Sequence, residues 1–367
     1  MTLLRTAAAL CTALLLALGL PATACAGTLY MGGYPNVLLL FDEAAGQVTR
    51  RIPLATGLPT GLHESADRKR IYVSTITTGG IETYDVATGR VVDSFSLNTP
   101  TTKYRFYSGV TDAAGRYFYT VAERIDKDVD RYRIGKPQYT VVDLKLHKVV
   151  RAVDMAAEDD TPGAPYRAAY AISPDARFLY VFRDKVIVVA TADLKAVERL
   201  DLAKSDLGGF ENVMFGGGVE ALRSPTQFVS LFNAADPYVH NKVFGVARFD
   251  LASRRFTFAP IGPASAMLAG LEVTPDGKHG YTVATTGTLG NKRCEFWHFD
   301  LTTDKLVETA ELPCRTRFQL GMSGDGTKLY IYGASFDIEV YDTKTLKLEK
   351  TWDIGNDATM AGMVVSQ

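Results

Sequence analysis

One short pattern constrains the fold of this chain more than any other feature: an apolar strand, a tight polar turn and a second apolar strand. Its clearest copy is AISPDARFLYV at residues 171–181. Pro and Gly suit the turn because Pro fixes φ and Gly allows φ > 0, while Val, Ile, Tyr and Phe suit pleated strands. Each copy therefore predicts a hairpin. The other copies lie at 63–73, 110–121, 273–283 and 322–331.

A second signal lies between these hairpins, in which two apolar residues are followed by Asp and a short polar turn. The copies are FDEAAG at 41, YDVATG at 84, VDLKLH at 142, FDLASR at 249, FDLTTD at 299 and YDTKTL at 341. A seventh, VATADLK at 189, has Ala190 where the others have Asp. Another short apolar run follows each copy. The two signals together predict four-stranded units of about 45 to 50 residues, the spacing of propeller blades.

The blade count depends on how the two ends of the chain are used. There are seven copies of the third-strand signal but only six internal first strands, at about 60–65, 105–111, 167–173, 212–218, 268–274 and 317–323. Residues 358–367 resemble a first strand that stops where its turn should begin, and residues 28–54 supply strands two, three and four. We therefore predict an all-β, seven-bladed β-propeller over residues 27–367, whose N- and C-terminal strands close one blade and hide its edges.

The first 26 residues are expected to lie outside this fold. They carry Arg5, an apolar run over residues 7–20 and then small residues, which is typical of a secretory signal peptide. The run of about 14 residues is too short for a bilayer span of roughly 20, so no transmembrane segment is expected. The signal predicts a periplasmic protein. Cys25 leaves a lipoprotein anchor open, although Ala22 stands where such signals usually have Leu.

Loop lengths differ between the two faces of the predicted ring. The turns after first and third strands lie on one face, here named the short-turn face, and the loops after second and fourth strands lie on the other, the long-loop face. Long loops in a tight repeat are usually functional, so we predict that partners or substrates bind the long-loop face. Drift on an unimportant face is the alternative, but drift should lengthen both faces. The long loops are 96–105, 123–138, 155–167, 203–214, 232–242 and 284–293.

Arginines occupy one equivalent position in three predicted first strands, six residues before the Ser or Thr of the turn. This position lies near the mouth of the central tunnel on the long-loop face. Two readings remain open: an anion-binding or docking role, or ion pairs with carboxylates such as Glu158, Asp159 or Asp160. With neighbouring Tyr and Arg, which are enriched at binding hot spots, the candidate binding residues are Tyr104, Arg105, Tyr132, Tyr166, Arg167, Tyr238, Arg315 and Arg317.

No motif for catalysis or cofactor attachment is found. There is no CxxCH, no glycine-rich strand-to-helix fingerprint and no nucleophile elbow, and the five His are scattered singly, so no catalytic or metal-binding residue is assigned. A formal net charge of −1 gives no reason to expect nucleic acid. Cys294 and Cys314 come together when the hairpin folds about residues 302–303, and in an exported protein this favours a structural disulfide over two thiols.

The chain resembles the β-propeller subunit of quinohemoprotein amine dehydrogenase, a periplasmic enzyme, over essentially the whole mature length. The resemblance is most specific in residues 95–143, in the NAADP loop before VFGVARFDLAS, and in VYDTKTLKLEKTWDIGNDATMAGMVV. It is looser with the methylamine dehydrogenase heavy chain and with exported repeat propellers. The Cys pair is a departure from the family, and the chain offers no catalytic residue that could be carried over.

The resemblance implies that this propeller holds no redox group of its own. In that family a dihaem cytochrome subunit holds the c-type haems, a small crosslinked subunit carries a tryptophylquinone, and the propeller is a platform that helps to wall the pocket for a small amine. We therefore expect a non-catalytic subunit. The alternative is a stand-alone exported propeller that binds a ligand or a protein. A hydrolytic propeller enzyme is least supported, because carboxylates do not converge on the predicted tunnel mouth.

Overall fold

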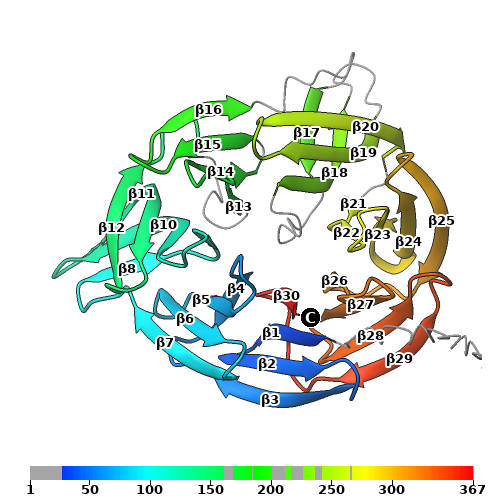
Figure 1. The fold of residues 1–367 in the computed structure, drawn as a ribbon, viewed down its shortest axis with the longest axis horizontal. Helices are drawn as coiled ribbons and strands as arrows, with labels where there is room; N and C mark the ends of the chain where they lie inside the picture. Colours follow the sequence, from blue (N-terminus) through cyan, green and yellow to red (C-terminus); the bar gives the residue numbers. More distant parts are fainter. Residues whose placement is uncertain are drawn as a thin grey trace, which may run out of the picture.

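The computed structural model describes residues 27–160, 168–183, 185–200, 211–215, 226–235, 242–264 and 267–366. Within these residues the strands form seven antiparallel sheets, arranged around a ring (Figure 1). The prediction of an all-β, seven-bladed propeller is confirmed. The described part contains one short 3-10 helix, Leu289–Asn291. It contains no helix long and apolar enough to cross a membrane.

The closing blade is built from both ends of the chain, as predicted. Its inner strand is β30 (Met363–Ser366), followed outward by β1 (Thr28–Gly33), β2 (Val37–Asp42) and β3 (Gln47–Pro53). Thr28 is paired with Ser366 and Tyr30 with Val364, so the C-terminus lies beside the first strand of the chain (Figure 1). The ring is thus closed by backbone hydrogen bonds rather than by side-chain packing alone.

The other six blades follow the chain in order, each with its first strand innermost. The second blade is β4 (Pro59–Glu64), β5 (Arg70–Thr75), β6 (Gly80–Asp85) and β7 (Arg90–Ser96). The third is β8 (Thr102–Arg105), β9 (Val110–Thr111), β10 (Tyr117–Lys127), β11 (Tyr132–Asp143) and β12 (Lys148–Asp154). The fourth is β13 (Ala169–Ile172), β14 (Phe178–Phe182), β15 (Val186–Ala190) and β16 (Ala196–Leu200).

The remaining three blades complete the ring. The fifth is β17 (Glu211–Phe215), β18 (Gln227–Ala235), β19 (Lys242–Asp250) and β20 (Arg255–Pro263). The sixth is β21 (Met267–Leu268), β22 (Glu272–Val273), β23 (His279–Thr286), β24 (Arg293–Asp300) and β25 (Lys305–Leu312). The seventh is β26 (Phe318–Met322), β27 (Lys328–Gly333), β28 (Asp337–Asp342) and β29 (Leu348–Asp353).

The core lies between the blades, because both faces of each middle strand are covered by a neighbouring sheet. Strand β15 shows this directly, since four of its five side chains are buried. Between the fourth and fifth blades, the ring of Phe182 stacks on Phe228 with centroids 4.3 Å apart and meets Phe249 edge-on at 5.6 Å. Buried aromatic rings of this kind supply large apolar areas, so adjacent blades hold one another in place.

Candidate functional site

The long-loop face differs from the short-turn face in the apolar side chains that it exposes. Among the described residues, every largely exposed aromatic ring and methionine lies on or beside a loop of the long-loop face, at exposures from 50% to 62%. They are Tyr34, Tyr132, Met267, Phe336 and Met360. The short-turn face exposes only Leu146 among the large hydrophobic residues that the structure describes, and the others in this class lie on fourth strands at the rim or on the β10–β11 hairpin. Contiguous exposed apolar patches are the surfaces at which proteins usually interact, so the long-loop face is the candidate interaction surface.

Three of these side chains surround the segment that closes the ring. The Tyr34 N–H donates to the Asp357 carbonyl at 2.8 Å, and Phe336 accepts from the N–H groups of Ile354 and Gly355 through its carbonyl. Met360 lies a few residues further on. The loops β1–β2, β27–β28 and β29–β30 therefore present their exposed side chains close to one another on the long-loop face.

The predicted arginines are positioned at that face, but they are already partnered. Arg105 ends β8, and its guanidinium donates to the Tyr107 hydroxyl at 3.0 Å. Arg317 lies just before β26, with its side chain 60% exposed and paired with Asp357 at 3.1 Å. The side chain of Arg317 is therefore largely accessible to solvent, although it is ion-paired. Its partner follows 40 residues later in the chain.

Arg315 is held inside the protein by two carboxylates. Its side chain is only 14% exposed, and its guanidinium lies 2.7 Å from Asp337 and 2.7 Å from Glu339, both on β28. Burial alone would lower the pKa of Arg315, but the hydrogen bonds to these two carboxylates raise it. Its geometry is that of a structural ion pair between the segment that precedes β26 and strand β28, and it leaves few donors for a ligand.

The remaining candidate residues divide into described and undescribed ones. Tyr132 is exposed at the start of β11, and Tyr104 is half-buried in β8, with its N–H bonded to the Asn98 side chain at 2.8 Å. Tyr166, Arg167 and Tyr238 lie outside the described residues.

Two of the carboxylates considered as partners for these arginines, Asp159 and Glu158, pair with other cationic side chains. Asp159 is fully buried and accepts from Arg199 at 2.7 Å, with the Lys185 ammonium 3.3 Å away. Glu158 also pairs with Arg199, at 3.1 Å. Burial would raise the pKa of Asp159, but the hydrogen bonds from Arg199 and Lys185 outweigh it and hold the pKa below its ordinary value. This cluster anchors the 155–160 turn to the outer strand of the fourth blade.

The predicted disulfide is present. Cys294 on β24 is bonded to Cys314, with their Cα atoms 5.3 Å apart and a sequence separation of 20. Cys294 is buried, and the bond ties the β24–β25 hairpin to the segment that leads into the seventh blade.

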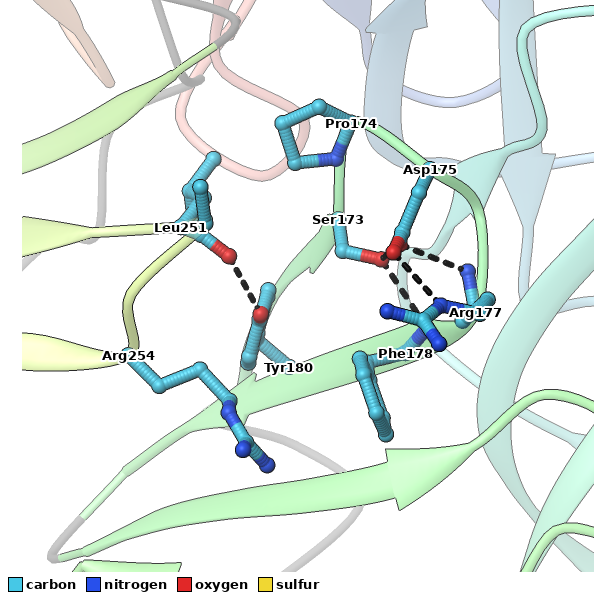
Figure 2. Close-up of a pocket in the computed structure, with 9 residues that line it drawn as sticks. Ser173, Pro174, Asp175, Arg177, Phe178, Tyr180, Leu251 and Arg254 are labelled. Atoms are coloured by element: carbon cyan, nitrogen blue, oxygen red, sulfur yellow. Dashed lines mark hydrogen bonds and ion pairs between the residues drawn. The ribbon is translucent and has the colours of Figure 1, made fainter.

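A pocket opens on the short-turn face, between the fourth and fifth blades (Figure 2). It has a volume of about 350 Å³, and it is lined by the turns at 173–178 and 251–254 together with Tyr180. Its polar groups satisfy one another, since Ser173 donates to Asp175 at 2.6 Å and Arg177 donates to the same carboxylate at 2.6 Å. The pocket lies between two blades, and the sequence pattern did not predict it.

Histidines and carboxylates do not build a metal centre in the part of the chain that the structure describes, because no group of three or more His, Cys, Asp or Glu converges there. His279 and His298 lie with ring nitrogens 3.1 Å apart, and burial lowers the pKa of His298. Burial also lowers the pKa of His63 to about 4, so this side chain stays neutral.

The fold is shared with many solved propellers, although no family model and no curated protein matches the chain. A periplasmic gluconolactonase from Pseudomonas aeruginosa is 15% identical, with a TM-score of 0.55, over 93% of this chain and 99% of that one. A dihydro-haem d1 dehydrogenase is 14% identical, with a TM-score of 0.52, over 93% and 75%. Hydrazine synthase from Kuenenia stuttgartiensis is 14% identical, with a TM-score of 0.50, over 84% and 95%. At such low identity these likenesses show the propeller fold alone.

Proposed function

We propose that this chain is the non-catalytic propeller subunit of a periplasmic amine dehydrogenase of the quinohemoprotein type. In this proposal it is exported by the signal peptide at residues 1–26. It scaffolds a dihaem cytochrome subunit and a small subunit bearing a tryptophylquinone, and it helps to wall the pocket for a small amine. The observation that carries the docking role is the gathering of exposed aromatic and methionine side chains on the long-loop face.

The physical argument concerns what a rigid ring can contribute to catalysis by other chains. A closed propeller presents several loops at fixed spacing, so a partner bound across them is held in one orientation. Covering the apolar side chains of Tyr34, Phe336 and Met360 would also exclude water from the interface. Amine oxidation needs an electron acceptor, and this sequence carries no attachment motif for a haem. We therefore assign the redox groups to the partner subunits.

Co-expression tests this proposal. The mature chain would be produced with a dihaem cytochrome and a small Cys- and Trp-containing chain encoded beside it, and then examined by size-exclusion chromatography and amine-dependent dye reduction. We expect co-elution and activity in the mixture, and a colourless, inactive propeller when it is purified alone. Amine oxidation by the isolated propeller would refute the assignment. Failure to co-elute with any redox partner would favour the stand-alone binding protein.

A matched pair of variants tests which face binds. Phe336→Ala on the long-loop face and Leu146→Ala on the short-turn face remove side chains that are both 52% exposed. Truncating a hot-spot side chain, of the kind found near the centre of an interface, costs about 2 kcal/mol or more. We therefore expect Phe336→Ala to weaken co-elution and Leu146→Ala to leave it unchanged, and equal losses from both would contradict docking on the long-loop face.

A further inference from the structure

The hairpin formed by β10 and β11 extends beyond its blade and leaves one strand edge open. In Figure 1 this hairpin projects past the outline of the ring near β8. Strand β12 pairs with β11 only from Gln138 onward, where Gln138 is opposite Asp154. Apart from β10 on the opposite side, no described strand pairs with residues 132–136 of β11, and all five of these residues are exposed.

The backbone polar groups on this edge point toward solvent. Lys127 is directly opposite Tyr132, and the Lys127 N–H donates away from β11, to the Thr101 carbonyl at 2.7 Å. Directly opposed residues of an antiparallel pair exchange both backbone hydrogen bonds or neither. The N–H and C=O of Tyr132 therefore point away from β10, and so do those of Ile134 two residues later.

One face of this extension is apolar and basic. Cross-strand pairing places Ile125 opposite Ile134 and Lys103 opposite Ile125, so these side chains share a face with Tyr132 and Lys127. Ile134 is 70% exposed and Tyr132 is 62% exposed. Lys103 and Lys127 are exposed and make no ion pair with a described carboxylate. Lys136 is likewise exposed at the end of the open edge.

The charges on the other face are internally balanced. Arg133 pairs with Asp128 at 2.9 Å, and Arg124 pairs with Asp126 at 3.1 Å. Thr102 also donates to Asp126, at 2.8 Å. The unbalanced charge of the extension is therefore positive and lies on the face of Tyr132 and Ile134.

We propose that the β11 edge at residues 132–136 captures an extended acidic segment of a partner protein by strand addition, a step that rests on the proposed docking function. The open N–H and C=O groups of Tyr132 and Ile134 would bond the added strand, as in other cases of β-augmentation. β-Branched residues would pack against Tyr132 and Ile134, and Asp or Glu would lie beside Lys136 on β11 and one strand away from Lys127 on β10. Lys103 on β8 lies further away and adds only to the positive charge of this face. A second copy of this chain fits less well, because it would bring a second set of the same three lysines into one sheet.

A designed peptide provides the direct test. The probe is acetyl-Glu-Thr-Val-Thr-Val-Thr-Glu-amide, which places two Val and two Glu on one face of a strand, and its control carries Lys in place of both Glu. We expect the mature chain to bind the Glu peptide, with slowed amide exchange in residues 129–137, and to bind the Lys peptide more weakly. Absence of protection in this segment, or equal binding of both peptides, would overturn the inference.

Ile134→Pro separates edge pairing from side-chain contact. The Ile134 N–H makes no bond to β10, so proline removes only a donor that faces outward, and the preceding residue is already extended as proline requires. We expect about five- to tenfold weaker binding of the Glu peptide, from the loss of one hydrogen bond. Ile134→Val keeps the N–H and should bind like the unchanged chain. Equal affinity of the Pro and Val variants would overturn the inference, and so would a concentration-dependent dimer that only Ile134→Pro abolishes, because it would identify a second copy as the occupant.

The same variants distinguish this inference from the proposed function. In the co-expression experiment, a complex that forms with Ile134→Val but is weakened in Ile134→Pro supports the edge as a docking element. A complex that forms equally with both variants overturns the edge proposal and leaves the proposed function standing. Glu-peptide binding by a chain that co-elutes with no redox partner in the co-expression experiment would support the edge and favour the stand-alone binding protein over the amine dehydrogenase subunit.

Discussion

Tyrosine hydroxyls join neighbouring blades at single, buried hydrogen bonds. Tyr180 is fully buried, and its hydroxyl donates to the Leu251 carbonyl of the next blade at 2.5 Å (Figure 2). Burial raises the pKa of Tyr180 to about 12, so the hydroxyl remains a donor at neutral pH. Tyr330 makes the same kind of bond to Glu43 in the closing blade.

We expect Tyr180→Phe to lower the free energy of unfolding by about 1 to 2 kcal/mol, because the Leu251 carbonyl would lose its partner inside the protein. Chemical denaturation would measure this change. Tyr72→Phe is the matched control, since Tyr72 occupies the same repeat position and its buried hydroxyl donates no hydrogen bond to a carbonyl of a described residue. If Tyr72→Phe cost as much as Tyr180→Phe, the hydrogen bond could not be the cause.

The buried pair of Asp159 and Arg199 should be sensitive to removal of its charge. Asp159→Asn leaves Lys185 without its carboxylate and Arg199 with only the exposed Glu158, and breaking a buried ion pair typically costs about 3 to 5 kcal/mol. The control is Glu198→Gln, at the residue next to Arg199 on β16. It breaks a half-exposed ion pair with Arg254 and should cost less than about 1 kcal/mol. A thermal midpoint for Asp159→Asn no lower than that of the control would contradict this assignment.

Aspartates recur in the tight turns, and they make the stability of the fold depend on pH in the acidic range. In the turns at 173–177 and 300–303, hydrogen bonds from Ser173 and Thr302 respectively lower the pKa of Asp175 and of Asp300 to about 2. Because these folded-state values lie below the ordinary value of about 3.9, their contribution is complete above pH 4 and is lost as the pH falls toward 2.

We therefore expect the thermal midpoint to decline between about pH 4 and pH 2, and to decline less steeply in Asp175→Asn. The variant should also be less stable than the unchanged chain at pH 7, where the charge is present. Scanning calorimetry across this range would measure both effects. A variant with the same slope as the unchanged chain would show that this carboxylate does not contribute to the acid sensitivity.

The hairpin of β24 and β25 is constrained by its strand pairing and also by the disulfide. A bond across 20 residues reduces the entropy of the unfolded chain, and the loop-closure model gives roughly 3 kcal/mol for this length. We expect the double variant Cys294→Ala, Cys314→Ala to unfold at a lower temperature. Mass spectrometry of the native protein should find no alkylatable thiol at these positions, and finding two would contradict the bond.

The architecture of the whole molecule could be predicted from the sequence, but the pairing of its charged side chains could not. The repeated turns, with Ser173 and Asp175 as one example, encode hairpins locally, so the blade order and closure could be predicted. Arg315 was offered as a binding residue, yet its carboxylates Asp337 and Glu339 lie on β28, two strands out from the inner strand β26 that Arg315 precedes. Such partners depend on the lateral register of strands. A repeat pattern read along one chain does not contain that register.

The open edge of β11 also escaped prediction for a physical reason. The loop at 123–138 was predicted to be long and functional, but its length does not reveal that most of it continues the ladder of β10 and β11. Two residues of its basic face, Lys103 and Lys127, lie on different strands, and they share a face only because β8 pairs with β10 with Lys103 opposite Ile125. The sequence thus placed the loop on the correct face of the ring, but it did not show the open strand edge.

Closure by β30 makes the stability of the ring depend on the last few residues. Removing residues 358–367 would leave the inner edge of β1 without a partner at Thr28 to Met31, and would expose part of the core that Val364 covers. We expect this truncation to lower the soluble yield and to increase binding of a hydrophobic dye. A circular permutant that links the C-terminus to residue 27 and opens the exposed turn between residues 87 and 88 should instead fold, because Thr28 and Ser366 are already paired and the closing blade keeps all four strands. Its far-ultraviolet circular dichroism should match that of the unchanged mature chain, and its thermal midpoint should lie well above that of the truncated chain. A truncated chain as stable as the permutant would show that the seven-bladed ring does not need its terminal strand.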